Sequence, residues 1–97
     1  MDEALMGDVV AALRRKDSSL AAQVLSEYLE EGNQGALLLA LREMTDAFGG
    51  AQNLAEQFGL NSRRLDRQLS SDGDPSVSDF SAILKAMGMQ LKVKNLG

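Results

Sequence analysis

Three arginines are the residues of this chain best suited to binding chemistry, because Arg63, Arg64 and Arg67 stand within five positions of one another. A guanidinium group is planar and permanently charged, and its N–H groups match the oxygens of a phosphate and the edge of a guanine base. In a chain that is acidic elsewhere, this cluster favours contact with DNA. The alternative is that the arginines are solvated residues of a helix surface.

A helix through this region turns the arginines away from its apolar side. At about 100° per residue, Arg63 and Arg67 lie roughly 40° apart, and Arg64 lies about 60° further round. Leu65 and Leu69 point the opposite way, toward a core. The periodicity therefore predicts one basic face, and a helix of this size fits the major groove of B-DNA.

The residues before the arginines predict a sharp corner between two helices. Leu54, Ala55 and Phe58 share one face of a short helix, which Gly59 ends because glycine tolerates a positive φ. Ala55 is small enough for two helices to approach closely, and Leu60 can fill the corner. This pattern is that of a helix-turn-helix.

Polar residues near this corner are placed to contact a DNA backbone. Gln52 begins the first helix of the motif, and Asn61 and Ser62 begin the second, where free backbone N–H groups favour phosphate. Gln68 lies at the edge of the basic face. The candidate DNA-binding residues are Gln52, Asn61, Ser62, Arg63, Arg64, Arg67 and Gln68.

Helical spacing and capping residues extend through most of the remaining chain. We expect a helix or a loose arm within residues 1–17 and a helix from Ser18 or Ser19 to Gly32. After Asn33 we expect an apolar helix buried all round, which is central in the core or also meets a second chain. A last helix begins at Ser76, where Asp79 completes a capping box.

The C-terminal segment alternates apolar and polar residues, a pattern typical of a β-strand over residues 89–94. No second strand is predicted, so the backbone would pair with another copy or another protein, or would fray. The predicted fold is an all-α, five-helix domain over residues 18–97 with this short C-terminal strand.

Composition excludes much of enzyme and metal chemistry. The chain has no cysteine and no histidine, which removes thiolate and imidazole nucleophiles and ligands. Its longest apolar run, residues 36–41, is far shorter than a membrane span. We expect no catalysis, no cofactor, no metal and no membrane partner. The acidic start, unlike a signal peptide, favours a cytoplasmic protein.

Charge is unevenly distributed around a net value of −4. Residues 1–60 carry ten acids and four bases, whereas residues 61–97 carry four acids and six bases. This asymmetry suggests two partners or one partner and a solvated back, although short chains also vary in charge by chance.

Several segments resemble the antidote (antitoxin) proteins of addiction modules, in the HigA-like branch of the lambda-repressor-like helix-turn-helix superfamily. The matching segments read YLEEGN at 28–33, LAEQFGL at 54–60, LDRQLSSDGDP at 65–75 and ILKAMGMQL at 83–91. One departure is Asp66, where the family usually has an aromatic residue. An acid there repels phosphate but can accept a hydrogen bond from the cytosine N4 amino group.

The resemblance implies a bacterial antitoxin that neutralises a small basic toxin, forms a homodimer and represses its own operon by binding double-stranded operator DNA. Two other hypotheses remain open: a free-standing helix-turn-helix repressor without a toxin, and a protein-interaction module that has lost DNA binding.

Overall fold

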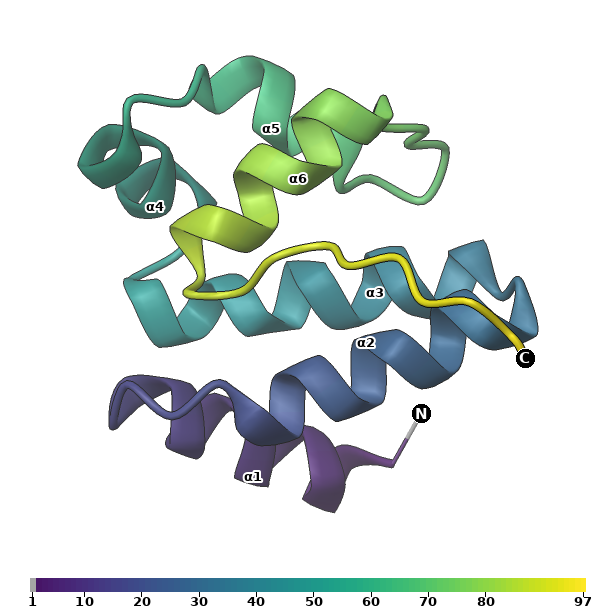
Figure 1. The fold of residues 1–97 in the computed structure, drawn as a ribbon. Helices are drawn as coiled ribbons and strands as arrows, with labels where there is room; N and C mark the ends of the chain where they lie inside the picture. The colour runs from purple at the N-terminus through teal and green to yellow at the C-terminus, as the bar shows by residue number, and fades with distance from the viewer. Residues whose placement is uncertain (1) are drawn as a thin grey trace.

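The computed structural model describes residues 2–97, and all regular secondary structure in that range is helical. Six α-helices and one 3-10 helix follow one another along the described chain (Figure 1). They are α1 (Glu3–Arg14), α2 (Ser19–Glu31), α3 (Gln34–Met44), η1 (Thr45–Phe48), α4 (Ala51–Phe58), α5 (Ser62–Gln68) and α6 (Val77–Ala86).

Local capping interactions set most of the helix bounds. The side chain of Asn33 accepts a hydrogen bond from the Ala36 N–H at 3.1 Å, and this bond satisfies a free donor at the start of α3. Ser18 or Ser19 was expected to act in the same way for α2, but Ser18 occupies the capping position and its side chain makes no such bond. The Asp17 carboxylate accepts the Ser19 N–H instead, at 3.0 Å, and the Ser18 hydroxyl donates to the Gly88 carbonyl.

Helix α3 forms the centre of the core. It lies between the α1–α2 pair and the group formed by α4, α5 and α6 (Figure 1). Ala40, Leu41 and Met44 on α3 are fully buried. The expected burial on all sides is not reached within a single chain, because Leu39 keeps 36% of its surface exposed.

Helix α1 belongs to the same core as the rest of the chain. Its buried side chains include Met6, Val9 and Leu13, which join the apolar cluster built around α3. Apolar burial of this kind is the main favourable contribution to folding. Residues 2–97 thus form six α-helices where five helices were predicted, because residues 3–14 form a complete packed helix.

The C-terminal segment is not a β-strand, which corrects the prediction for residues 89–94. Residues 89–97 form neither helix nor strand. In Figure 1 they run as an extended segment across the middle of the molecule. Met89, Gln90, Leu91, Lys92 and Lys94 line a shallow hollow with Ala22, Leu25 and Leu29 of α2. A strand needs a neighbouring extended segment to pair with, and the described chain contains none.

Within residues 2–97, no helix has both the length and the apolar character needed to cross a membrane.

Candidate nucleic-acid interface

The corner between α4 and α5 is built around one glycine. Gly59 adopts the left-handed conformation, with φ 68°, as the sequence predicted. The Leu60 N–H then donates to the Ala55 carbonyl at 2.8 Å, and Ala55 itself is fully buried. The Asn61 side chain accepts the Arg64 N–H at 3.0 Å and begins α5. Only three residues therefore separate the end of α4 from the start of α5.

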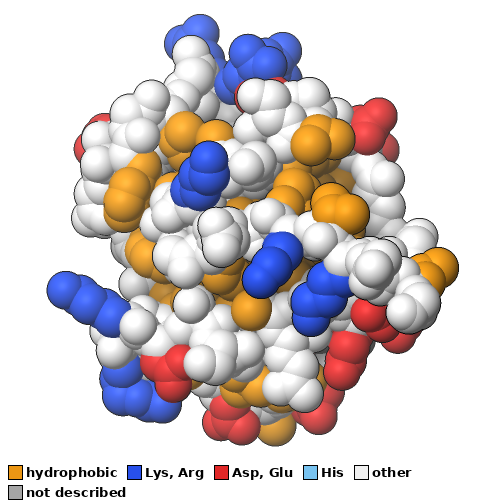
Figure 2. All heavy atoms as spheres, in the orientation of Figure 1, with side chains coloured by type: hydrophobic (Ala, Val, Ile, Leu, Met, Phe, Trp, Pro, Cys, Tyr) orange, Lys and Arg blue, Asp and Glu red, His pale blue; other side chains and the backbone are white. Residues whose placement is uncertain are grey.

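Helix α5 has a buried side and an exposed side. Leu65 and Leu69 are each only 2% exposed and hold the helix against the core. Arg63 and Arg67 are exposed, and neither forms an ion pair with any residue in the range 2–97. Figure 2 shows basic side chains gathered at the end of the molecule where Figure 1 places α5. This end therefore offers two guanidinium groups to an anion.

A shallow groove joins the starts of α4 and α5. Three predicted contact residues, Gln52, Ser62 and Arg63, line it together with Ala51 and Asp66. The Gln52 amide donates weakly to Glu56, at 3.4 Å, and stays exposed. Arginine, hydroxyl and amide groups in one groove suit phosphate and base edges. The Asp66 carboxylate adds an acceptor that repels phosphate.

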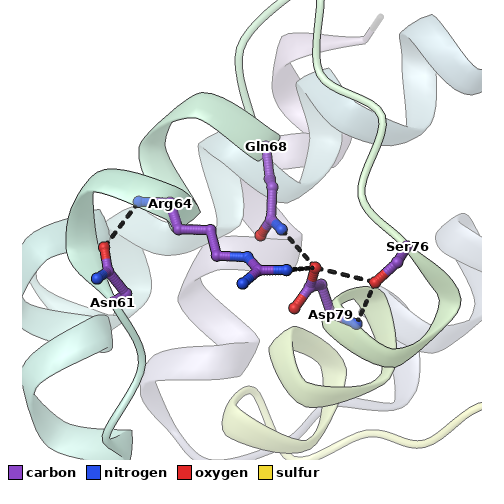
Figure 3. Close-up of polar contacts among 5 residues, drawn as sticks. All are labelled: Asn61, Arg64, Gln68, Ser76 and Asp79. Carbon is purple, nitrogen blue, oxygen red and sulfur yellow. Dashed lines mark hydrogen bonds and ion pairs between the residues drawn. The ribbon is translucent and has the colours of Figure 1, made fainter.

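Arg64 does not share the outward direction of the other two arginines, so the prediction of a single three-arginine face is corrected. Its Nη2 atom lies 2.8 Å from Oδ2 of Asp79 on α6 (Figure 3). Gln68 donates to the same oxygen from Nε2 at 2.7 Å. The helical periodicity placed Arg64 and Gln68 toward one edge of the basic face. That edge is the side of α5 that meets α6.

The sequence did not reveal that Asp79 of α6 links to Arg64 and Gln68 of α5. Sequence reasoning assigned it only to the α6 capping box, and the Ser76 hydroxyl does accept the Asp79 N–H at 3.1 Å. The Ser76 hydroxyl also donates to Oδ2, at 2.9 Å. This hydrogen bond and the adjacent Arg64 guanidinium hold the pKa of the Asp79 carboxyl below its usual value.

Arg67 lies beside the loop that follows α5. With Arg64 and Gln68 it lines an open hollow whose far wall is formed by Asp72, Gly73 and Asp74. The candidate contacts are therefore divided between two sides of α5. Gln52, Ser62 and Arg63 lie together on one side. On the other side, Asn61, Arg64 and Gln68 line a hollow with Asp79 of α6, and Arg67 lies beside Arg64 and Gln68.

These features define a small all-helical protein with a basic helix at one end. A family model described as probable addiction module antidote protein matches residues 7–95, which is most of the chain. The chain therefore belongs to this family and is a probable antitoxin of an addiction module. The family implies a toxin partner and a regulatory protein rather than an enzyme. No curated protein and no solved structure matches the chain significantly.

Proposed function

We propose that this antitoxin also binds the operator DNA of its own operon, through α5. The observation that carries the proposal is the exposure of Arg63 and Arg67 on a helix whose other side is fixed in the core by Leu65 and Leu69. Side chains that read base edges must be held rigidly, and a helix anchored in this way satisfies that requirement.

In the proposed complex, α5 lies in the major groove. Arg63 and Arg67 contact guanine edges or phosphates through their planar N–H groups. Gln52 and Ser62, on the groove between α4 and α5, hydrogen-bond the DNA backbone. Asn61 contributes through its side-chain NH2, because its carbonyl oxygen is engaged by the Arg64 N–H.

Two copies of the chain bind together in this proposal. A helix in one major groove reads only a few base pairs, and a homodimer doubles the site by placing a second α5 about 34 Å along the duplex. Binding at the promoter then represses the operon that encodes the chain.

The toxin is proposed to bind away from α5. The exposed acids Glu27, Glu30 and Glu31 on α2 carry a charge that complements a basic toxin. Figure 2 shows acidic side chains at the lower right of the molecule, away from α5, on the side where Figure 1 places α1 and α2. Both partners can therefore be bound without competing for one charged surface.

The DNA-binding proposal is tested by fluorescence anisotropy with the promoter duplex of the chain's own operon. Arg63→Ala combined with Arg67→Ala is expected to weaken binding by about 1–3 kcal/mol for each arginine that reads a base. Each arginine that only contacts phosphate instead lowers the salt slope by about 0.9. The control is Arg14→Ala with Arg15→Ala, which removes the same charge from exposed positions at the end of α1.

Equal affinity of the wild-type and Arg63/Arg67 variants would contradict this interface. With toxin binding intact, that result would favour the protein-interaction module. Specific DNA binding without capture of a toxin encoded beside the chain would instead favour a free-standing repressor.

A further inference from the structure

One carboxylate oxygen connects α5, the helix proposed to enter the major groove, to the first turn of α6. Oδ2 of Asp79 accepts hydrogen bonds from Arg64 at 2.8 Å, Gln68 at 2.7 Å and Ser76 at 2.9 Å (Figure 3). Arg64 and Gln68 belong to α5, whereas Ser76 and Asp79 begin α6. Asp79 therefore joins the exposed edge of α5 to the first turn of a different helix.

The place of these hydrogen bonds on α5 determines which motion of the helix they restrict. Arg64 and Gln68 are four residues apart, so they are neighbours on one side of α5. Leu65 and Leu69 hold the adjacent side of the helix in the core. The two apolar anchors restrict the distance of α5 from the core. The two polar contacts on a neighbouring side restrict its rotation about its own axis, and that rotation sets the direction of Arg63 and Arg67.

The same contact decides where the third guanidinium lies. Arg64 keeps 59% of its side chain exposed, so it is within reach of solvent and of a nearby phosphate. Asp79, which is 25% exposed, holds it at the α6 side by a charge-assisted hydrogen bond. Without that carboxylate, Arg64 is a long flexible cation beside the proposed DNA surface.

We propose that Asp79 is a positioning residue for DNA discrimination, holding α5 in one orientation and keeping Arg64 from binding phosphates of any sequence. This inference rests on the proposed DNA-binding function and extends it. A phosphate contact carries no sequence information of its own, whereas a base contact depends on precise placement. Loss of Asp79 therefore raises affinity for unrelated DNA and lowers the preference for the operator.

The test compares Asp79→Asn with Asp72→Asn on two duplexes, the operator and a scrambled sequence of equal length. Asp72 is an exposed acid in the loop after α5, so both variants remove one negative charge from the same region. Added positive charge alone strengthens binding to both duplexes equally. We expect Asp72→Asn to keep the wild-type ratio of affinities and Asp79→Asn to lower it by about threefold to tenfold, the effect of one polar contact.

Two further variants separate positioning from general destabilisation. Asp79→Glu retains the carboxylate and the capping-box pattern, and is expected to restore most of the discrimination. Arg64→Met breaks the contact from α5 without freeing a cation, so the preference for the operator should fall while binding to the scrambled duplex does not rise. Circular dichroism of each variant identifies any that has lost its fold.

The possible results separate the role of Asp79 from the proposal that the chain binds operator DNA. A wild-type protein that binds both duplexes equally would contradict specific DNA binding itself. A wild-type protein that prefers the operator, with equal ratios for Asp79→Asn, Arg64→Met and Asp72→Asn, would overturn only the role of Asp79.

Discussion

At the scale of single residues, neighbouring side chains of one type have different roles. Arg63 and Arg67 are exposed and have no acidic partner within 4 Å in the described chain, whereas Arg64 is paired with Asp79. The difference arises because α6 begins on one side of α5 only. A guanidinium that faces an acid at hydrogen-bonding distance is stabilised there, and its neighbours remain available for another partner.

Two carboxyl groups with lowered pKa values are expected to make the stability of the fold sensitive to acid. The pKa of Asp79 is lowered mainly by the Ser76 hydroxyl and next by Arg64, and that of Asp17 mainly by the Ser19 N–H. A carboxyl with a lowered folded-state pKa stabilises the fold fully above its unfolded pKa of about 3.9. That contribution is lost as pH falls through the lower, folded-state value.

We therefore expect the wild-type urea midpoint to fall between about pH 5 and pH 3 more steeply than that of Asp17→Asn combined with Asp79→Asn. The double variant should be the less stable protein at pH 5. Parallel curves for the two proteins would show that these carboxylates do not contribute to acid unfolding.

At the scale of elements, short connections determine how the site is assembled. Gly59 places α5 directly after α4, and the loop after α5 returns the chain to α6. In that loop, a Cβ atom at Gly73 would collide with the Gln68 carbonyl oxygen, which is backbone and cannot move aside easily. Gly73 is therefore required for space, at the point where the loop passes the end of α5.

Two glycine-to-alanine changes should have opposite effects. Gly73→Ala is expected to destabilise the fold by about 1–3 kcal/mol, because the loop must move away from α5. Gly7→Ala is expected to stabilise it by about 0.5–1 kcal/mol, because Gly7 lies inside α1 and a Cβ there has nothing within 4 Å. Urea unfolding measures both. Destabilisation by Gly7→Ala, or none by Gly73→Ala, would contradict this account.

At the scale of the whole molecule, charge is unevenly distributed over the surface while the core is shared. Figure 2 shows basic side chains at the α5 end and also at the lower left, and acidic side chains mostly at the lower right and bottom, on the side where Figure 1 places α1 and α2. The two ends are not independent units, since Val9 of α1 and Val24 and Leu25 of α2 belong to the same apolar cluster as Leu65 of α5. Deleting α1 and α2 would expose this core, so the two proposed partners must be separated by surface substitutions.

The distribution of charge leads to a prediction about toxin capture. Glu30→Gln with Glu31→Gln is expected to slow association with a basic toxin encoded beside this chain by about threefold to tenfold at low salt, because surface charges act mainly on association rates. The control, Glu43→Gln with Asp46→Asn, removes the same charge from exposed positions at the end of α3 and in η1. Biolayer interferometry gives the rates. Equal slowing in both pairs would show that overall charge, rather than the α2 end, guides the toxin.

Local features of the sequence determined most of the helices and their ends. Asn33, Gly59 and the Ser76–Asp79 capping box act on residues a few positions away, so their effects were predictable without knowing the fold. The two exposed arginines, Arg63 and Arg67, followed from the same local periodicity.

Tertiary structure alone decided the features that depend on which elements meet. The pairing of Arg64 with Asp79 spans fifteen positions and requires α6 to pack beside α5. The segment 89–94 has a strand-like pattern, but a strand forms only where another extended segment is adjacent, and α2 lies there instead. Alternating apolar and polar side chains favour a strand, but the element that packs beside the segment determines whether a strand forms.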